Sequence, residues 1–175
     1  EISSYPPGYK ENGSVFCHTN PWVMIAETCL GRGDQAYDYY RRINPSVLEE
    51  ESEVHLTEPY VYAQMISGFE AAKEGEAKNS WLTGAAAWNY VAITQYILGI
   101  RADYDGLHIE PVFPRSWHGF TATREFRGVR YEIIVQRTGP GNNVAIEADG
   151  QVFQGNTIPL PTKGTKEVKV MVKVS

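Results

Sequence analysis

The feature that most constrains the fold is a change in hydrophobic spacing shortly after residue 101. Beyond this point, apolar and polar residues alternate with a period of two over 107–111, 120–126, 129–135, 143–147 and 167–172. Such alternation is typical of strands with one buried face. The pairs Arg127-Gly128 and Asp149-Gly150 separate strands and suit tight hairpins. The pattern predicts an antiparallel β-sandwich domain over residues 104–175.

Residues 1–103 have the composition of helices joined by loops. Helical spacing and punctuation predict helices over 21–30, 34–43, 58–67 and 85–98. Asp34 is expected to cap the second helix, and Gly99 is well placed to end the fourth. The chain is therefore predicted to be an α+β multidomain protein, with the helices first and the β-sandwich second.

Two of the predicted helix starts carry polar groups. His18 lies just before the first helix, where Thr19 or Asn20 can cap, and Thr83-Gly84 lies just before the fourth. Thr83 is expected at or near the N-cap, with Gly84 in the first turn leaving the backbone amides uncovered.

A hydroxyl, open amides and the positive end of a helix dipole together form an anion site. If both helix starts face one cavity, His18, Thr83 and Gly84 would hold an oxyanion, with phosphate the first candidate. A histidine satisfied by backbone groups and an ordinary helix cap are the alternative interpretation.

Composition excludes several classes of function. The 175 residues carry a net charge of −5, which argues against a nucleic-acid surface. No apolar run is long enough to span a bilayer. Cys17 and Cys29 lie in or beside a predicted helix, so both are predicted to be reduced, which favours the cytoplasm. No metal-ligand spacing or nucleotide-binding loop is present, so neither a metal nor a cofactor is expected.

Aromatic residues suggest two further interpretations. Lys10 lies near Tyr5 and Tyr9 in the sequence. Lys10 is either a surface charge or a residue that hydrogen-bonds sugar hydroxyls, with the two tyrosine rings as a stacking surface. The tryptophans Trp22, Trp81 and Trp88 are predicted to belong to the core. Among the carboxylates near these loops, Glu1, Glu58 and Glu76, no pair stands out as the acid and base of a glycosidase.

Four segments, in this order, resemble the C-terminal portion of glycoside hydrolase family 94, the family of cellobiose and chitobiose phosphorylases. They are residues 5–13 (YPPGYKENG), 16–22 (FCHTNPW), 58–62 (EPYVY) and 75–84 (GEAKNSWLTG). The similarity continues through residues 103–107 into the β part. Residues 5–13 look most like the cellobiose enzymes. The loop-rich beginning at Glu1 also indicates the C-terminal part of something longer.

The resemblance implies that the chain holds the last helices of an (α/α)6 barrel and a C-terminal β-sheet domain. It implies an inverting reaction in which cellobiose and phosphate give α-D-glucose 1-phosphate and D-glucose, with inorganic phosphate as co-substrate. By the same resemblance, His18, Thr83 and Gly84 match phosphate-binding positions. Glu1, Tyr5 and Lys10 match positions that line the sugar sites, mainly that of the reducing-end glucose. The general acid, an Asp, and a phosphate-binding Arg are expected upstream, and a homodimer is implied.

Phosphate explains why a second carboxylate is not required. An inverting hydrolase needs a base to activate water, whereas phosphate is already an anionic nucleophile that the protein has only to position. The alternatives are a phosphorylase for cellodextrins, laminaribiose or chitobiose, a barrel hydrolase that uses water, and a non-catalytic carbohydrate-binding or structural module.

Overall fold

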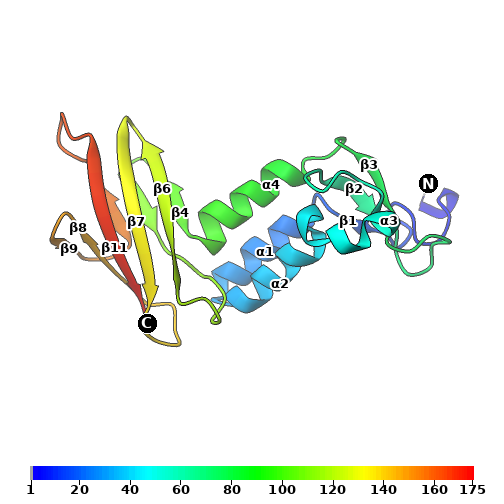
Figure 1. Ribbon diagram of the computed structural model, residues 1–175, viewed down its shortest axis with the longest axis horizontal. Coiled ribbons are helices and arrows are strands. Elements are labelled where there is room, and N and C mark those ends of the chain that lie inside the picture. Colours follow the sequence, from blue (N-terminus) through cyan, green and yellow to red (C-terminus); the bar gives the residue numbers. More distant parts are fainter. Residues whose placement is uncertain (1) are drawn as a thin grey trace. The chain divides into compact units, whose positions relative to one another are not determined.

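The computed structural model describes residues 2–175, apart from the side chain of Ile2. Residue contacts divide the chain into two units, and Figure 1 shows the elements of both. Unit 1 comprises the residues up to Glu27 together with Gln35–Ala92, and unit 2 comprises Thr28–Asp34 and Ile93–Ser175. The predicted domain limits, 1–103 and 104–175, stay a prediction, because units defined by contacts need not coincide with domains.

The helical segments of the chain lie mostly in unit 1. In chain order, the helical segments are Ile2–Ser4, α1 (Asn20–Cys29), α2 (Gly33–Ile43), Pro45–Val47, Glu49–Glu51, α3 (Ser52–His55) and α4 (Ala85–Val91), which is followed by a π-helix over Ala92–Ile97. The end of α1, the start of α2 and nearly all of the π-helix belong to unit 2. Met24, Ile43 and Ala92 form a buried apolar cluster, so the apolar faces of α1 and α2 pack as their helical spacing predicts. Gly99 has a φ of 67°, a conformation suited to glycine, just after the predicted end of the fourth helix.

A three-stranded sheet in unit 1 contradicts the helix predicted over residues 58–67. Its strands are β1 (Val15–Phe16), β2 (Ala63–Ile66) and β3 (Ala77–Ser80), and β2 pairs antiparallel with both neighbours. Ala63 and Met65 are buried while Gln64 between them is half-buried. The segment therefore follows period two, over a stretch too short for the composition to distinguish from a helical turn.

Unit 2 contains two sheets. One has the order β10-β5-β4, and the other has the order β6-β7-β11-β8-β9. The strands are β4 (Ile100–Ala102), β5 (Gly106–Ile109), β6 (Gly119–Phe126), β7 (Val129–Arg137), β8 (Val144–Ala148), β9 (Gln151–Phe153), β10 (Thr157–Pro159) and β11 (Glu167–Val174). All five segments predicted from alternation are strands.

The prediction of a wholly antiparallel unit is wrong for one pair, because β11 runs parallel to β7. The chain leaves the larger sheet after β9, contributes β10 to the smaller sheet, and returns as β11 between β7 and β8. Alternation identifies the buried face of a strand but not its direction. The hairpins occur as predicted, since Arg127-Gly128 and Asp149-Gly150 all have positive φ, as a tight hairpin turn requires.

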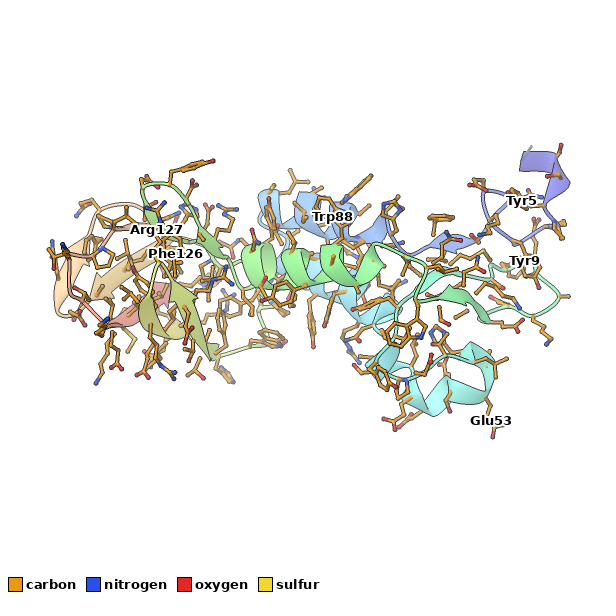
Figure 2. All side chains as sticks on the ribbon, turned by 90° about the horizontal axis from the view of Figure 1, so that it is seen from above. Tyr5, Tyr9, Glu53, Trp88, Phe126 and Arg127 are labelled. Atoms are coloured by element: carbon orange, nitrogen blue, oxygen red, sulfur yellow. The ribbon has the colours of Figure 1, made fainter. Side chains whose placement is uncertain are left out.

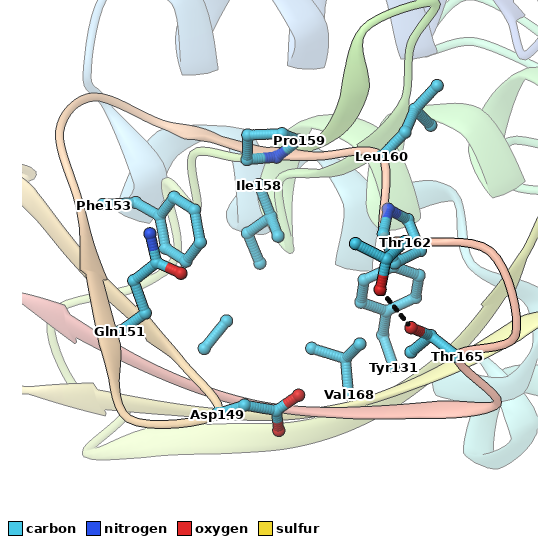
Figure 3. Close-up of a pocket in the computed structure, with 12 residues that line it drawn as sticks. Tyr131, Asp149, Gln151, Phe153, Ile158, Pro159, Leu160, Thr162, Thr165 and Val168 are labelled. Atoms are coloured by element: carbon cyan, nitrogen blue, oxygen red, sulfur yellow. Dashed lines mark hydrogen bonds between the residues drawn. The ribbon is translucent and has the colours of Figure 1, made fainter.

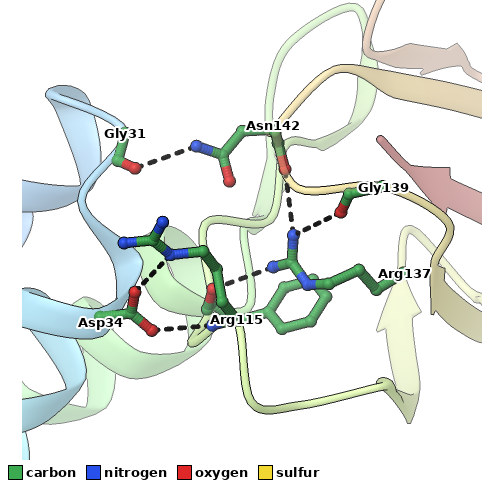
Figure 4. Close-up of polar contacts among 8 residues, drawn as sticks. Gly31, Asp34, Arg115, Arg137, Gly139 and Asn142 are labelled. Carbon is green, nitrogen blue, oxygen red and sulfur yellow. Dashed lines mark hydrogen bonds and ion pairs between the residues drawn. The ribbon is translucent and has the colours of Figure 1, made fainter.

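Residues 28–34 are joined by polar contacts to two loops of unit 2, at Arg115 and Asn142 (Figure 4). The Asp34 carboxylate accepts hydrogen bonds from the backbone N–H and from Nε of Arg115, at 2.8 and 2.7 Å. Asn142 donates to the carbonyl of Gly31 at 3.0 Å. The predicted capping role of Asp34 is therefore replaced: Asp34 lies inside the first turn of α2, and its carboxylate binds Arg115.

Candidate functional site

The start of α4 places a hydroxyl and a glycine next to each other. Gly84 is the N-cap, and the Thr83 hydroxyl oxygen accepts a hydrogen bond from the backbone N–H of Ala85 at 3.0 Å. The cap is thus one residue later than predicted, although Thr83 still supplies the capping oxygen. Because a hydroxyl has one donor and two acceptor positions, the Thr83 hydrogen remains able to donate. Thr83 is half-buried and Gly84 is exposed.

His18 lies just before α1, in a frame of aromatic rings. Its ring centroid is 5.5 Å from that of Trp22, and Trp22 in turn lies 5.7 Å from Trp88 of α4; both contacts are edge-to-face. The side chains of Thr19 and Asn20 donate to the carbonyl of Phe16, at 3.1 and 2.8 Å. These bonds fix the turn that carries His18.

The structure brings His18 and Gly84 together. A Cβ atom placed on Gly84 would lie 3.6 Å from Cδ2 of His18 and 3.8 Å from Cδ1 of Trp88. The two helix starts, far apart in the sequence, therefore lie side by side within unit 1. An imidazole, a hydroxyl and an uncovered glycine at one location are the donors that an anion requires.

Tyr5 and Lys10 belong to a second group of residues in unit 1. Figure 2 shows Tyr5 close to Tyr9 and well away from Trp88. Tyr5 is 38% exposed, and Lys10 is half-buried. Glu1, the remaining predicted sugar-site residue, lies outside the described residues. Tyr5 is thus placed apart from the aromatic frame of His18.

Two residues that the sequence did not indicate hold Lys10 in place. The Lys10 ammonium donates to Oε1 of Gln64, and the same oxygen accepts a hydrogen bond from Asn79 at 2.9 Å. Lys10 has a φ of 49° and Asn79 a φ of 55°, an uncommon conformation outside glycine. Positive φ outside glycine is visible only in the structure. Gln64 carried no sequence signal, and Asn79 was marked only by its place in the segment 75–84.

The prediction that the tryptophans belong to the core is wrong. Trp22, Trp81 and Trp88 are 47%, 66% and 39% exposed. Trp81 lies against Tyr60, with ring centroids 6.5 Å apart, and its indole N–H donates to Glu58. Large apolar rings at this exposure provide a contact surface in unit 1.

Two buried ionisable groups of unit 1, Glu76 and Cys17, are unsuited to acid or nucleophilic catalysis. Glu76 is buried but its carboxylate lies 2.7 Å from Nζ of Lys78, and the hydrogen bond from Lys78 lowers the pKa of Glu76. Glu76 is therefore ionised at neutral pH and unsuited to act as a general acid. Burial raises the pKa of the Cys17 thiol to about 12, so Cys17 is not a nucleophile.

Neither a metal centre nor a membrane span is found in the part of the chain that the structure describes. No three His, Cys, Asp or Glu side chains among these residues are grouped so as to hold a metal ion. Within the same residues, no helix combines the length and the hydropathy needed to cross a membrane.

Comparisons with known proteins found a matching family model and several relatives. Residues 1–99 match the model of the glycosyl hydrolase 94 superfamily, catalytic domain. The chain is 40% identical to an N,N'-diacetylchitobiose phosphorylase of Vibrio proteolyticus over 167 residues, which is 94% of this chain and 21% of that protein. It is 46% identical to the phosphorylase of the same name from Vibrio furnissii over 129 residues, 74% of this chain and 16% of that one.

A solabiose phosphorylase of Paenibacillus borealis is 30% identical over 161 residues, 91% of this chain and 21% of its own length. The chain thus spans about a fifth of the length of these relatives.

Proposed function

The chain belongs to the glycosyl hydrolase 94 superfamily, and we propose that it is the C-terminal part of an inverting disaccharide phosphorylase. The observation that carries the proposal is the approach of His18 to Gly84, at the helix start where the Thr83 hydroxyl lies. In the proposed reaction, phosphate attacks the anomeric carbon, and the products are an α-sugar 1-phosphate and the reducing-end sugar. The names of three similar proteins, all phosphorylases, support this reaction.

Each of the three residues has a role in the proposed phosphate site. The Thr83 oxygen is held by the Ala85 amide, so its hydrogen can point to a phosphate oxygen. The Gly84 amide lies at the positive end of α4 and has no side chain to cover it. The His18 atom nearest to Gly84 is Cδ2, and Nε2, which is bonded to it, is proposed as the ring nitrogen that donates to the anion. Together they position an anion and offset its charge.

Other parts of the proposal rest on the family. We propose that the helices of residues 1–99 complete an (α/α)6 barrel, whose upstream part supplies the general acid Asp and a phosphate-binding Arg. Tyr5 and Lys10 are proposed to contact the sugar in the reducing-end position. A homodimer is proposed on family likeness. A cytoplasmic location is proposed because Cys17 and Cys29 are both unpaired.

Two disaccharides are candidates for the substrate. The two Vibrio relatives, named for N,N'-diacetylchitobiose, are 40% and 46% identical, which favours this disaccharide. The likeness of residues 5–13 to the cellobiose enzymes favours cellobiose instead. We propose the chitobiose reaction as the first candidate and the cellobiose reaction as the second.

Synthesis in the reverse direction separates these candidates. The complete protein is incubated with α-D-glucose 1-phosphate or N-acetyl-α-D-glucosamine 1-phosphate as donor, and with glucose or N-acetylglucosamine as acceptor. We expect diacetylchitobiose from the N-acetylated pair. Cellobiose from the glucose pair would establish the second candidate. Cleavage of either disaccharide at full rate in phosphate-free buffer would identify a hydrolase and contradict the proposal.

The phosphate site is tested by Thr83→Val, with Thr83→Ser as the matched control. Valine has a similar shape but no hydroxyl, so we expect phosphate affinity to fall by about 1.5–3 kcal/mol, the range for a hydrogen bond to a charged group. Serine retains both the hydroxyl and the cap and should bind phosphate within about threefold of the parent. Unchanged phosphate affinity in the valine variant, measured by calorimetry, would remove Thr83 from the site.

A further inference from the structure

A cavity at one end of the two sheets of unit 2 has no role in the proposed phosphorylase reaction. Its volume is about 380 Å³, within the range of roughly 300–1,000 Å³ typical of small-molecule sites. Figure 3 shows Phe153 and Gln151 on one side, and Tyr131, Thr162 and Thr165 on the other. The larger sheet provides one wall of this cavity, and β10 with the segment that follows it provides another.

Strand register determines which side chains face this cavity. Tyr131 pairs with Val168 across β7 and β11, and both are buried. Gln151 pairs with Ala148, and Phe153 pairs with Ile146, whose side chain is buried in the interior. Gln151 and Phe153 therefore belong to the inner face. Val152 between them belongs to the outer face and is 66% exposed.

The Tyr131 hydroxyl is an unsatisfied polar group at this cavity. The Tyr131 side chain is fully buried, at 0% exposure, and its hydroxyl has no hydrogen-bond partner. Burial also raises the pKa of Tyr131, so the hydroxyl is neutral and retains its proton. Buried hydroxyls are nearly always paired in native proteins, and an exception requires an explanation such as a bound molecule. The hydroxyl is itself covered, so a ligand in the cavity supplies the missing partner by displacing the side chains that cover it.

The lining favours a neutral, polyhydroxylated ligand. Phe153, Ile158 and Pro159 present apolar surface. Polar atoms come from Gln151, Asp149 and the hydroxyls of Thr162 and Thr165, which lie 3.3 Å apart. The described residues that line the cavity include no lysine or arginine, so a phosphate or another anion would have no counter-charge there.

We propose that this cavity in the β-rich unit is a sugar-binding site that holds a single pyranose ring. A pyranose has apolar C–H faces, which suit the Phe153 ring and its apolar neighbours. Its hydroxyls both donate and accept, which suits the Tyr131 hydroxyl and the Gln151 amide. The predicted phosphate and sugar residues that the structure describes lie in unit 1, so this site does not depend on the proposed catalytic function.

Methyl NMR of the complete protein tests the proposal, with D-glucose and N-acetyl-D-glucosamine titrated as separate probes. We expect the Ile158 and Val168 methyl signals to shift and saturate with at least one of the two sugars. Glycerol at the same concentration should not shift them. The absence of saturable shifts with both sugars, or equal shifts with glycerol, would overturn the proposal.

Variants assign the contacts. Tyr131→Phe should weaken sugar binding about tenfold, as expected for one lost hydrogen bond, and should leave the melting temperature of the ligand-free protein unchanged or higher. Phe153→Ala should weaken binding at least tenfold, whereas Val152→Ala, on the outer face of the same strand, should leave it unchanged. Equal affinity in the parent, Tyr131→Phe and Phe153→Ala proteins would overturn the proposal. A lower melting temperature for Tyr131→Phe, with unchanged affinity, would show that the hydroxyl has a structural partner instead.

Discussion

Gly84 offers a test of the phosphate site that separates binding from folding. Its φ of −81° and ψ of 0° are open to residues other than glycine. A methyl group there would meet Cδ2 of His18 at 3.6 Å and Cδ1 of Trp88 at 3.8 Å, which is ordinary van der Waals contact. The fold therefore has room for Gly84→Ala without displacing a neighbour.

Two opposing effects determine the stability of this variant. Replacing glycine reduces the entropy of the unfolded chain, which stabilises by about 0.4–1 kcal/mol. Alanine is a poorer N-cap than glycine. The loss of capping lowers the stability of the helix by an amount similar to the entropic gain, within the roughly 0.5–2 kcal/mol that separates capping residues. We expect the free energy of unfolding to change by less than about 0.5 kcal/mol.

The effect on phosphate should be much larger. The added methyl group lies against His18, beside the Gly84 amide and next to the position proposed for the anion. Displacing the anion from one hydrogen-bond donor costs about 1.5–3 kcal/mol, which corresponds to an affinity roughly ten- to a hundredfold weaker. Calorimetry with inorganic phosphate and thermal unfolding of the same protein provide the two measurements. Phosphate affinity within about twofold of the parent, at unchanged stability, would refute the location of the site.

Three further outcomes are expected. Gln64→Leu removes the oxygen that binds Lys10 and Asn79. It should therefore raise the KM for the disaccharide severalfold and leave the KM for phosphate unchanged. Equal changes in the two KM values would contradict a sugar-binding role for Lys10. Asp34→Asn should lower the free energy of unfolding at pH 7 by about 0.5–1 kcal/mol, because the exposed Asp34 side chain (47%) is screened by solvent. Arg115 lowers the pKa of Asp34 from 3.8, so the stabilisation is complete above that pH and is lost as the pH falls further. The control is Asp38→Asn, which breaks only the i,i+4 pair with Arg42. An Asp34→Asn effect that does not depend on pH would contradict the ion pair. A thiol reagent at pH 8 should modify the exposed Cys29 quickly and the buried Cys17 only after unfolding; Cys29→Ser should remove the fast reaction, and its persistence would show that Cys17 is accessible.

Local patterns in the sequence were sufficient for much of unit 2. Alternation predicted β5, β6, β7, β8 and β11, and in β7, β8 and β11 buried residues alternate with exposed ones. Arg127-Gly128 and Asp149-Gly150 gave the hairpin turns, because positive φ at both positions favours such residues. The motifs in residues 1–99 also gave the family, which the comparison confirms.

The sequence by itself therefore determined the strand faces, the hairpin turns, the helix starts at His18 and Thr83, and the family. The tertiary structure alone decided the parallel pairing of β11 with β7, the strand over Ala63–Ile66, the contact of Gln64 with Lys10, and the cavity beside Tyr131. The physical reason is distance along the chain. Conformational preferences and periodicity act over a few neighbouring residues, whereas pairing, burial and cavities depend on residues that meet only after the chain has folded.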